Sequence, residues 1–302
     1  MVPLFNAERY VGQCIQALLT QDYPTDAYEI LMVDNNSTDR SATIVRQHRR
    51  IRLLSEREQG AYTARNRALP HAVGTIIAFT DPDCVPDRNW LQTIAAGMAD
   101  PGVGILVGSH QFAPRSFALS ALEAYDNVKK AFVLNGARSE LYYGHANNMA
   151  VRRSLLDELG PFAERYRGSD TLFVQGCLER YSVDAVRFCG DMKVRHLEID
   201  SVGAYYHKCA IYGASQRRYG QIANVRPLDM GERWTVYRRT VRQRRYSPMQ
   251  ALYLLGLLGV GFVYWALGGR AAHLAGEGKV SRFTGSGRKR VTQPEGGENL
   301  DD

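Results

Sequence analysis

Two aspartates separated by one residue, Asp81 and Asp83, follow directly after the apolar run TIIAFT. Carboxylates in this D-x-D arrangement at the end of a strand suit a hard divalent cation. Mg²⁺ and Mn²⁺ are typically held by one or two carboxylates together with substrate phosphates and water. A cation held there would neutralise the two phosphates of a nucleoside diphosphate as it becomes a leaving group. The pair alone is a weak signal, because two acids at this spacing often occur by chance.

The same residues fit a second chemistry. The string IIAFTDPDCV also matches the D-x-D-x-[TV] pattern of haloacid-dehalogenase-type phosphatases, in which the first aspartate is a nucleophile. That pattern usually opens its domain on the first strand, whereas at least two βα units precede Asp81. A later strand-end Ser or Thr, a Lys and a second acidic pair are also not evident. The phosphatase is therefore the weaker alternative.

An alternation of helices and strands is predicted around these aspartates from the spacing of apolar residues. The predicted elements are helix 7–20, strand 28–33, helix 41–48, strand 51–54, helix 61–72 and strand 75–80. This order argues for an α/β fold with a largely parallel sheet. Ligands bind beyond the carboxyl ends of such strands, so Asp34 and Asp81 are candidates for one cleft. Each of them could instead cap the helix that follows.

Five longer strings occur in order along the chain: LFNAERYVGQCIQALLTQDYPTDAYEILMVDNNSTDRS, EREQGAYTARNRAL, GTIIAFTDPDCVPDRNWL, GHANNMAVRRSLLDELGPF and GSDTLF. Together they resemble the family 2 glycosyltransferases of the GT-A fold, from Pro3 to about His196. The resemblance implies a Rossmann-like mixed sheet flanked by helices. It also implies an inverting transfer of a sugar from a nucleotide-diphosphate sugar, with a leaning to uridine, to a saccharide or lipid-linked acceptor. Mn²⁺ or Mg²⁺ is the implied cofactor.

The resemblance also implies roles for individual residues. The nucleotide-sugar site is expected to include Pro3, Asn6, Glu8, Asp34, Arg65 and Asp81. Asp83 matches the direct metal ligand, with Asp81 beside it, and His196 resembles a late histidine that completes the metal or pyrophosphate site. Asp170 matches the base that deprotonates the acceptor hydroxyl, since an alcohol is a poor nucleophile until a carboxylate takes its proton. Asp170 as a helix cap and His196 as a packed residue are the alternatives.

The chain starts almost at Pro3, where the family has a full apolar strand. A strand needs about five residues, so we expect the sheet to lack most of its first member. A catalytically impaired GT-A module that binds nucleotide or acts as a scaffold is therefore the alternative from another functional class. The acids Asp34, Asp81, Asp83 and Asp170 are retained, and they favour an active enzyme.

Residues 248–269 contain no charged residue and read PMQALYLLGLLGVGFVYWALGG. About 20 residues of helix span about 30 Å, the thickness of the hydrocarbon core of a bilayer. Tyr253, Tyr264 and Trp265 stand where interfacial aromatic belts usually lie. The segment is predicted to form a single transmembrane helix. A buried core helix is the alternative, because glycines are frequent in it.

Much of the formal net charge of +7 lies beyond Arg217, and six arginines between residues 233 and 245 precede the apolar segment. Basic and aromatic residues together can bind nucleic acid. Next to an apolar span they favour anionic head groups or a lipid-linked phosphate, so we expect a membrane and no nucleic acid as partner. The arginine bias predicts a cytoplasmic N-terminal part at the inner membrane, and no signal peptide is visible.

These features predict four segments. They are a GT-A domain over 1–200, a basic and aromatic membrane-proximal helical region over 201–247, the span over 248–269, and a disordered polar tail over 270–302. The five cysteines are scattered and form no C-x-x-C pair, which indicates reduced thiols in a cytosolic environment. The predicted enzyme would build a cell-surface polysaccharide or glycolipid.

Overall fold

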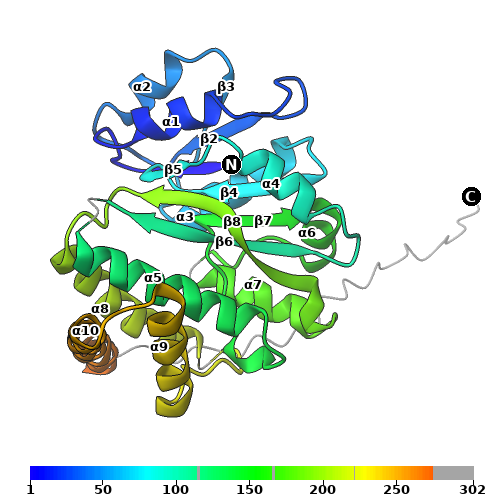
Figure 1. The fold of residues 1–302 in the computed structure, drawn as a ribbon. Coiled ribbons are helices and arrows are strands. Elements are labelled where there is room, and N and C mark those ends of the chain that lie inside the picture. The colour runs from blue at the N-terminus through cyan, green and yellow to red at the C-terminus, as the bar shows by residue number, and fades with distance from the viewer. Residues whose placement is uncertain (114–115, 165–166, 221, 275–302) are drawn as a thin grey trace, which may run out of the picture.

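The computed structural model describes residues 1–113, 116–164, 167–220 and 222–274, and most of the tail predicted to be disordered lies outside these ranges (Figure 1). The strands are β1 (Val2–Leu4), β2 (Ile30–Asp34), β3 (Ile51–Ser55), β4 (Ile76–Thr80), β5 (Cys84–Pro86), β6 (Ile105–Phe112), β7 (Asn148–Arg152) and β8 (Val186–His196). The longer helices are α1 (Val11–Leu19), α2 (Ser41–Arg46), α3 (Ala61–Ala68), α4 (Trp90–Gly97), α5 (Phe117–Leu134), α6 (Arg153–Leu159), α7 (Ser169–Leu178), α8 (Val202–Tyr219), α9 (Met230–Arg244) and α10 (Pro248–Leu274). Short 3₁₀ turns are η1 (Leu69–His71), η2 (Ser139–Leu141) and η3 (Val183–Ala185).

The strands form two sheets. In the first, β1, β2 and β3 are parallel, and Leu4, Asp34 and Ser55 are aligned at their carboxyl ends. The second has the order β4-β7-β6-β8-β5, in which β6 and β8 are parallel and the other neighbours are antiparallel. The α/β fold with a mixed sheet is therefore confirmed. The largely parallel arrangement expected from the first half holds only in the smaller sheet.

The two sheets meet where β1 lies beside β4. The α-ammonium of Met1 donates to the carbonyl of Ala78 at 2.8 Å, and the amide of Thr80 donates to the carbonyl of Met1 at 3.2 Å. With three residues, β1 is shorter than the usual strand of about five, and only its first end reaches β4. The shortness of this strand thus coincides with a break between the sheets rather than with a missing neighbour of β2.

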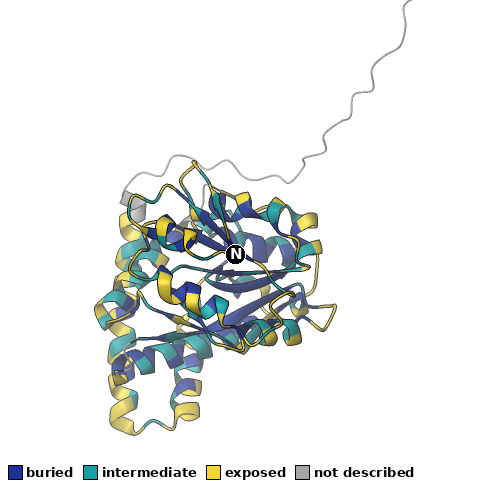
Figure 2. Ribbon diagram, turned by 90° about the horizontal axis from the view of Figure 1, so that it is seen from above, coloured by how far each residue is buried: buried dark blue, intermediate teal, exposed yellow. Residues whose placement is uncertain are grey.

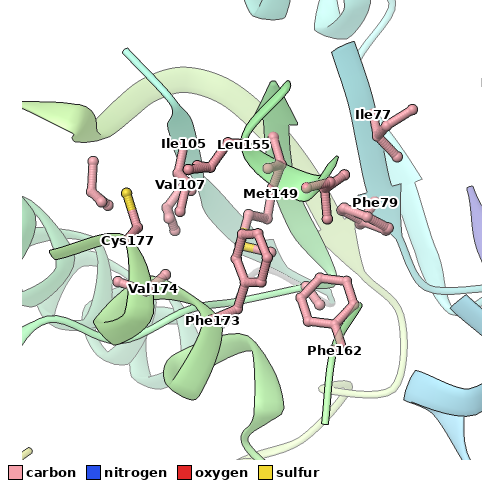
Figure 3. Close-up of a cluster of buried hydrophobic side chains, with 14 of the residues drawn as sticks. Ile77, Phe79, Ile105, Val107, Met149, Leu155, Phe162, Phe173, Val174 and Cys177 are labelled. Carbon is pink, nitrogen blue, oxygen red and sulfur yellow. The ribbon is translucent and has the colours of Figure 1, made fainter. Parts of the chain in front are cut away.

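A buried hydrophobic cluster joins the second sheet to α7 (Figure 3). Phe162 packs between Phe173 of α7 and Phe79 of β4, with ring centroids 5.1 and 5.3 Å away, and Met149 of β7 points into the same cluster. Each large buried side chain of this kind contributes about 1.5–3 kcal/mol. The cluster therefore fixes α7, with Asp170 in its first turn, against the sheet.

A bulge in β8 is stabilised by one buried amide, that of Asn148. The register between β6 and β8 shifts after Gly108, so three residues of β8 lie outside the ladder. The Asn148 side chain donates to the carbonyls of Ser109 and Met192, each at 2.8 Å, and accepts a hydrogen bond from Trp90 Nε1 at 2.9 Å. Every polar atom of this side chain is thereby satisfied, and the bulge exposes no orphaned carbonyl at Met192.

The helices α8 and α10 pack closely through small residues. A Cβ on Gly268 would lie 1.9 Å from the carbonyl oxygen of Ala210, and one on Gly213 would lie 1.9 Å from that of Trp265. The Tyr206 hydroxyl also donates to the carbonyl of Leu257 at 3.1 Å. By length and composition, the stretch 248–271 of α10 is apolar enough to cross a membrane. Its opposite face is exposed (Figure 2), with large apolar side chains at Met249, Leu252, Tyr253, Leu255, Val260, Val263 and Leu267.

We expect the substitution Gly268→Leu to separate α10 from α8, because no side chain fits between the two backbones. Overpacking of this kind costs about 1–3 kcal/mol. The thiol of Cys209, which lies 3.8 Å from the Cβ position of Gly261 on α10, should then be alkylated about tenfold faster. The rate is measured with iodoacetamide in a Cys189→Ser background, so that the other half-buried thiol is removed.

The matched control is Gly256→Leu, because among the described residues, its chain neighbours and the adjacent backbone of α10 apart, no atom lies within 4 Å of a Cβ at that position. It adds the same apolar side chain to the same helix, and the alkylation rate should stay unchanged. Equal rates for both variants would show that the α8–α10 contact does not depend on these glycines.

Candidate functional site

A cavity of about 1190 Å³ is lined by residues that range in sequence from Pro3 to Trp265. At one end it is bounded by the carboxyl ends of β1, β2 and β4, with Pro3 and Asn6 in its wall, and at the other by α9 and α10, with Trp234 and Phe262. In Figure 1 the first sheet lies at the top of the view and α9 and α10 lie at the bottom, with the second sheet between them. Asp81, Asp83, Asp170 and His196 all line this cavity, so residues from three separate sequence segments meet there.

The Asp81 carboxylate forms an ion pair with Arg65 of α3. The Arg65 guanidinium is 3% exposed and its Nη2 lies 2.5 Å from Asp81 Oδ1. The same guanidinium stacks over the Tyr62 ring, 5.0 Å from its centroid. The family resemblance alone suggests a place for Arg65 near the nucleotide, and the structure gives it a contact with Asp81. The carboxylate of Asp81 is thereby neutralised on the side of α3.

Asp83 and His196 form a different pair. The antiparallel pairing of β5 with β8 sets Cys84 opposite His196, and the amide of Leu197 donates to the carbonyl of Asp83 at 2.8 Å. His196 Nδ1 lies 3.5 Å from Asp83 Oδ2. Possible ligand atoms of Asp83, Cys84 and His196 all lie within 4.8 Å of one another. The sequence predicted Asp83, Asp81 and His196 together, and Asp81 does not belong to this group.

The donor atoms of this pair fit a divalent cation. His196 is 4% exposed and its Nδ1 has no hydrogen-bond partner in the described part of the chain. Burial lowers its pKa to about 4, so the imidazole is neutral and offers a lone pair. Burial, and then the Asp81 carboxylate, raise the pKa of Asp83, and a bound cation would favour its ionised form. Burial also raises the pKa of Cys84, which leaves a thiol, a poor ligand for a hard cation.

Asp170 lies in the first turn of α7, after Gly168 with a φ of +93°. Its Oδ2 accepts a hydrogen bond from the amide of Ala146 at 2.9 Å, and the Tyr62 hydroxyl also bonds to this carboxylate. Burial raises its pKa, although these hydrogen bonds act in the opposite direction. The N-cap of α7 is Gly168, so Asp170 is not its capping residue. A buried carboxylate of raised pKa beside a cavity is suited to accept a proton.

The residues expected around the nucleoside divide into two groups. Pro3 and Asn6 line the cavity, whereas Glu8 and Asp34 do not. The Glu8 carboxylate accepts the backbone N–H of Arg40 at 2.9 Å, so it ties two loops together. Asn6 has a φ of +44° and accepts the amide of Thr38 at 2.8 Å.

Asp34 ends β2 as predicted, but it does not cap α2, whose N-cap is Arg40. The next residue, Asn35, lines the cavity instead and is 2% exposed. Its side chain accepts the amide of Gly60 at 2.7 Å and donates to the carbonyl of Glu58 at 2.7 Å. Asn35 therefore connects the end of β2 to the start of α3.

Several polar residues of the cavity were not predicted from the sequence. Glu198 lines the cavity and forms an ion pair with Lys208 at 2.5 Å. It lies two positions after His196, and this closeness in sequence could have identified it as a residue of the cavity. His110 and Lys130 belong to β6 and α5, elements for which no prediction was made. For Asn147 and Asn148 the sequence left open whether they order a turn or line the acceptor cleft. The structure buries Asn148 in the bulge and places Asn147 in the cavity wall.

The chain matches a family model described as glycosyl transferase family 2 over residues 1–160. It is 30% identical over 167 residues to the glycosyltransferase AglE of Haloferax volcanii, covering 54% of each chain. It is 29% identical over 180 residues to a beta-monoglucosyldiacylglycerol synthase of Synechocystis, covering 55% of this chain and 36% of the relative. The chain thus spans about half of the first relative and about a third of the second.

Among solved structures, the mannosyltransferase PcManGT of Pyrobaculum calidifontis, in complex with GDP-Man and Mn²⁺, is similar in fold. The TM-score is 0.59 at 21% identity, and the match covers 91% of this chain and 74% of that one. This likeness shows a GT-A fold. The family match includes Asp81 and Asp83 and favours a glycosyltransferase over the haloacid-dehalogenase-type phosphatase.

We expect Mn²⁺ to raise the melting temperature of the protein, because a ligand that binds only the folded state stabilises it. At about 100 times Kd the stabilisation is about 2.7 kcal/mol, or on the order of 5 °C for a protein of this size. Asp83→Asn and His196→Ala should abolish the shift, and Cys84→Ser should keep it. The measurement is thermal unfolding with and without MnCl₂. A full shift in Asp83→Asn would place the cation elsewhere.

Proposed function

The chain belongs to glycosyl transferase family 2, and on that premise we propose that it transfers a sugar from a nucleotide-diphosphate sugar to an acceptor hydroxyl with inversion. The observation that carries the proposal is one cavity that holds both a cation-binding pair, Asp83 and His196, and a buried carboxylate, Asp170. A scaffold needs neither group. Both are costly to bury without a purpose, since burial disfavours the charged form of each.

The donor is proposed to bind between the first sheet and β4. Pro3, Asn6 and Asn35 would line the nucleoside pocket there, and Asp81 and Arg65 would lie at its base. A cation held by Asp83 and His196 would supply charge neutralisation of the diphosphate. PcManGT was solved with GDP-Man and Mn²⁺ bound, whereas the family resemblance of this chain implies a leaning to uridine. A screen of UDP-linked and GDP-linked sugars is therefore the first test of donor identity.

Asp170 is proposed to take the proton of the acceptor hydroxyl. The amide of Ala146 and the hydroxyl of Tyr62 orient its carboxylate by hydrogen bonds. The oxygen activated in this way attacks the anomeric carbon from the face opposite the leaving diphosphate, which inverts that centre. A carboxylate fixed by hydrogen bonds loses little freedom in this step, so its position contributes to the rate.

The acceptor is proposed to be lipid-linked and the enzyme to act at a membrane. The cavity continues from Asp170 to an apolar wall formed by α9 and α10, where Arg233 lies 5.1 Å from the Phe262 ring and 5.5 Å from the Trp265 ring. The Synechocystis relative is named as the synthase of a diacylglycerol lipid. An apolar wall beside a helix with an exposed apolar face suits an acceptor that enters from lipid.

How α10 meets the membrane follows from its contacts. It packs on α8 as far as Gly268, so it lies along the body of the protein for much of its length. This arrangement favours contact of its exposed face with lipid at the interface. A single span by residues 248–269 and the inner membrane as location stay predictions. The exposed arginines of α9, Arg238, Arg239 and Arg242, would meet anionic head groups.

For the base, we expect Asp170→Asn to lower kcat by about 10²–10⁴-fold, because general-base catalysis contributes that much. Donor binding should be unchanged, since Asn keeps the size of the side chain. Asp191→Asn, at an exposed carboxylate, is the control and should be silent. Initial rates with the donor found in the screen, and its Kd by calorimetry, give the two quantities. Turnover by Asp170→Asn close to wild type would remove Asp170 as the base.

The pH profile gives a second measure for the same residue. The base must be ionised to act, and burial raises the pKa of Asp170 above the usual range of an aspartate. The rate of the wild type should therefore fall as the pH drops through this raised pKa, at a higher pH than for an ordinary aspartate. The residual rate of Asp170→Asn should lack this fall.

For the membrane, we expect the protein to bind vesicles of phosphatidylcholine with phosphatidylglycerol better than vesicles of phosphatidylcholine alone. Replacing Arg238, Arg239 and Arg242 by Gln should weaken binding to the anionic vesicles by about 100-fold, because each arginine near the surface contributes about 1 kcal/mol. Flotation with the vesicles measures the bound fraction.

The control removes the same charge elsewhere. Arg46, Arg49 and Arg57 are exposed near the first sheet, far from α9. Their replacement by Gln should leave vesicle binding within about twofold. If both triple variants bound equally well, the arginines of α9 would have no special part in membrane contact.

A further inference from the structure

Lys130 in α5 is a buried cation that forms no direct ion pair within the described residues. Its side chain is 3% exposed, and Nζ is hydrogen-bonded to Nδ1 of His110. Within the described residues, no carboxylate lies within ion-pair distance of Lys130. The neighbouring Lys129 differs, because its Nζ lies 2.7 Å from Asp126 Oδ1. The Asp126 and Glu123 carboxylates act on Lys130 without pairing with it directly, and they do not offset its burial. A buried ammonium with no directly paired anion is unfavourable, so its presence calls for an explanation.

His110 does not neutralise this lysine. Its Nε2 lies 3.0 Å from the amide oxygen of Asn147, which can only accept, so Nε2 carries the proton. Nδ1 therefore presents a lone pair to Lys130, and the imidazole is neutral. Burial lowers the pKa of His110 and lowers that of Lys130 to about 7. The His145 ring, 5.6 Å from that of His110, also has its pKa lowered by burial and supplies no anion.

These groups face the same cavity as the proposed active site. Lys130, His110 and Asn147 line it together with Asp83 and His196. The rings of His110 and His196 are 6.2 Å apart, so the lysine that bonds to His110 lies on the α5 wall near the pair Asp83 and His196. An anion that enters the cavity would find a nearly dry ammonium there, where a charge-assisted hydrogen bond is stronger than at the surface.

We propose that Lys130, oriented by His110, binds a phosphate oxyanion on the α5 wall of the cavity, apart from the cation pair Asp83 and His196. The inference rests on the proposed function, which makes the cavity a substrate site. Two phosphates could serve, the diphosphate of the donor or a phosphate on a lipid-linked acceptor. The wall of α9 and α10 beyond this point is apolar and aromatic, with Tyr237, Leu258 and Phe262.

The test compares ligand binding by the wild type and Lys130→Met. The probes are farnesyl monophosphate, farnesol, and UDP or GDP with Mn²⁺, each measured by calorimetry in detergent. If the subsite serves the acceptor, the wild type should bind farnesyl monophosphate about tenfold or more tightly than farnesol. A hydrogen bond between charged groups contributes enough binding free energy for a difference of this size. Lys130→Met should lose that preference and keep nucleotide binding. If the subsite serves the donor, the variant should instead lose about tenfold in nucleotide affinity.

Two controls make the result specific. Lys129→Gln removes a neighbouring charge that is already paired with Asp126, and it should change each affinity by less than about twofold. Lys130→Gln keeps a donor toward His110 but no charge. Its affinity for the phosphate ligand should fall as that of Lys130→Met does. Lys130→Gln takes the place of Lys130→Met in the test if Lys130→Met does not fold.

Stability separates binding from a structural role. Without ligand, Lys130→Met should unfold at the same or a higher temperature than the wild type, because it removes a buried cation. The proposal is overturned if Lys130→Met binds nucleotide and farnesyl monophosphate as the wild type does, or if Lys129→Gln loses the same affinity. If the wild type transferred sugar from none of the donors in the screen, the proposed function would be refuted. The binding comparison between the wild type and Lys130→Met would still decide whether the phosphate subsite exists.

Discussion

The buried side chain of Asn148 is the contact on which the geometry of the site depends. It bonds to β6 through Ser109, to β8 through Met192 and to α4 through Trp90. The β8 bulge that it stabilises sets the register that brings His196 opposite Cys84 and so beside Asp83. The residues before Asn148 lead to Ala146, whose amide holds Asp170. Loss of this amide would leave buried carbonyls unsatisfied, at about 1–3 kcal/mol each.

The two aspartates of the D-x-D pattern show how far a motif can be interpreted. The sequence placed both at a strand end, and β4 does end immediately before Asp81. The sequence could not show that Asp81 forms an ion pair with Arg65, whereas Asp83 lies next to His196. Burial, and then the Asp81 carboxylate, raise the pKa of Asp83. A separate partner for each acid keeps both carboxylates available. Those partners come from α3 and β8, at distances along the chain that no local pattern encodes.

What the sequence predicted well was local. Strands 28–33, 51–54 and 75–80 and the helix near 61–72 are present within a few residues, because apolar runs and periodicity record burial directly. In β8 the residues Gly190 and Asp191 interrupt the apolar pattern, and they lie in the bulge, so this single strand looks like two in the sequence. Lys130 of α5 and His110 of β6 were not predicted as site residues, because neither belongs to a local sequence pattern. Only the hydrogen bond between their side chains, which lie 20 positions apart in the sequence, shows that they form one group.

The helix α8 links the proposed lipid-facing surface to the proposed base. One side of it packs on α10 through Gly213, and its C-terminal residue Tyr219 lies so close to Gly168 that a Cβ there would be 2.4 Å from the ring. Gly168 in turn is the N-cap of α7, next to Asp170. Closely packed helices move as units rather than deform. α8 thus contacts both the helix with the exposed apolar face and the N-cap of the helix that carries Asp170.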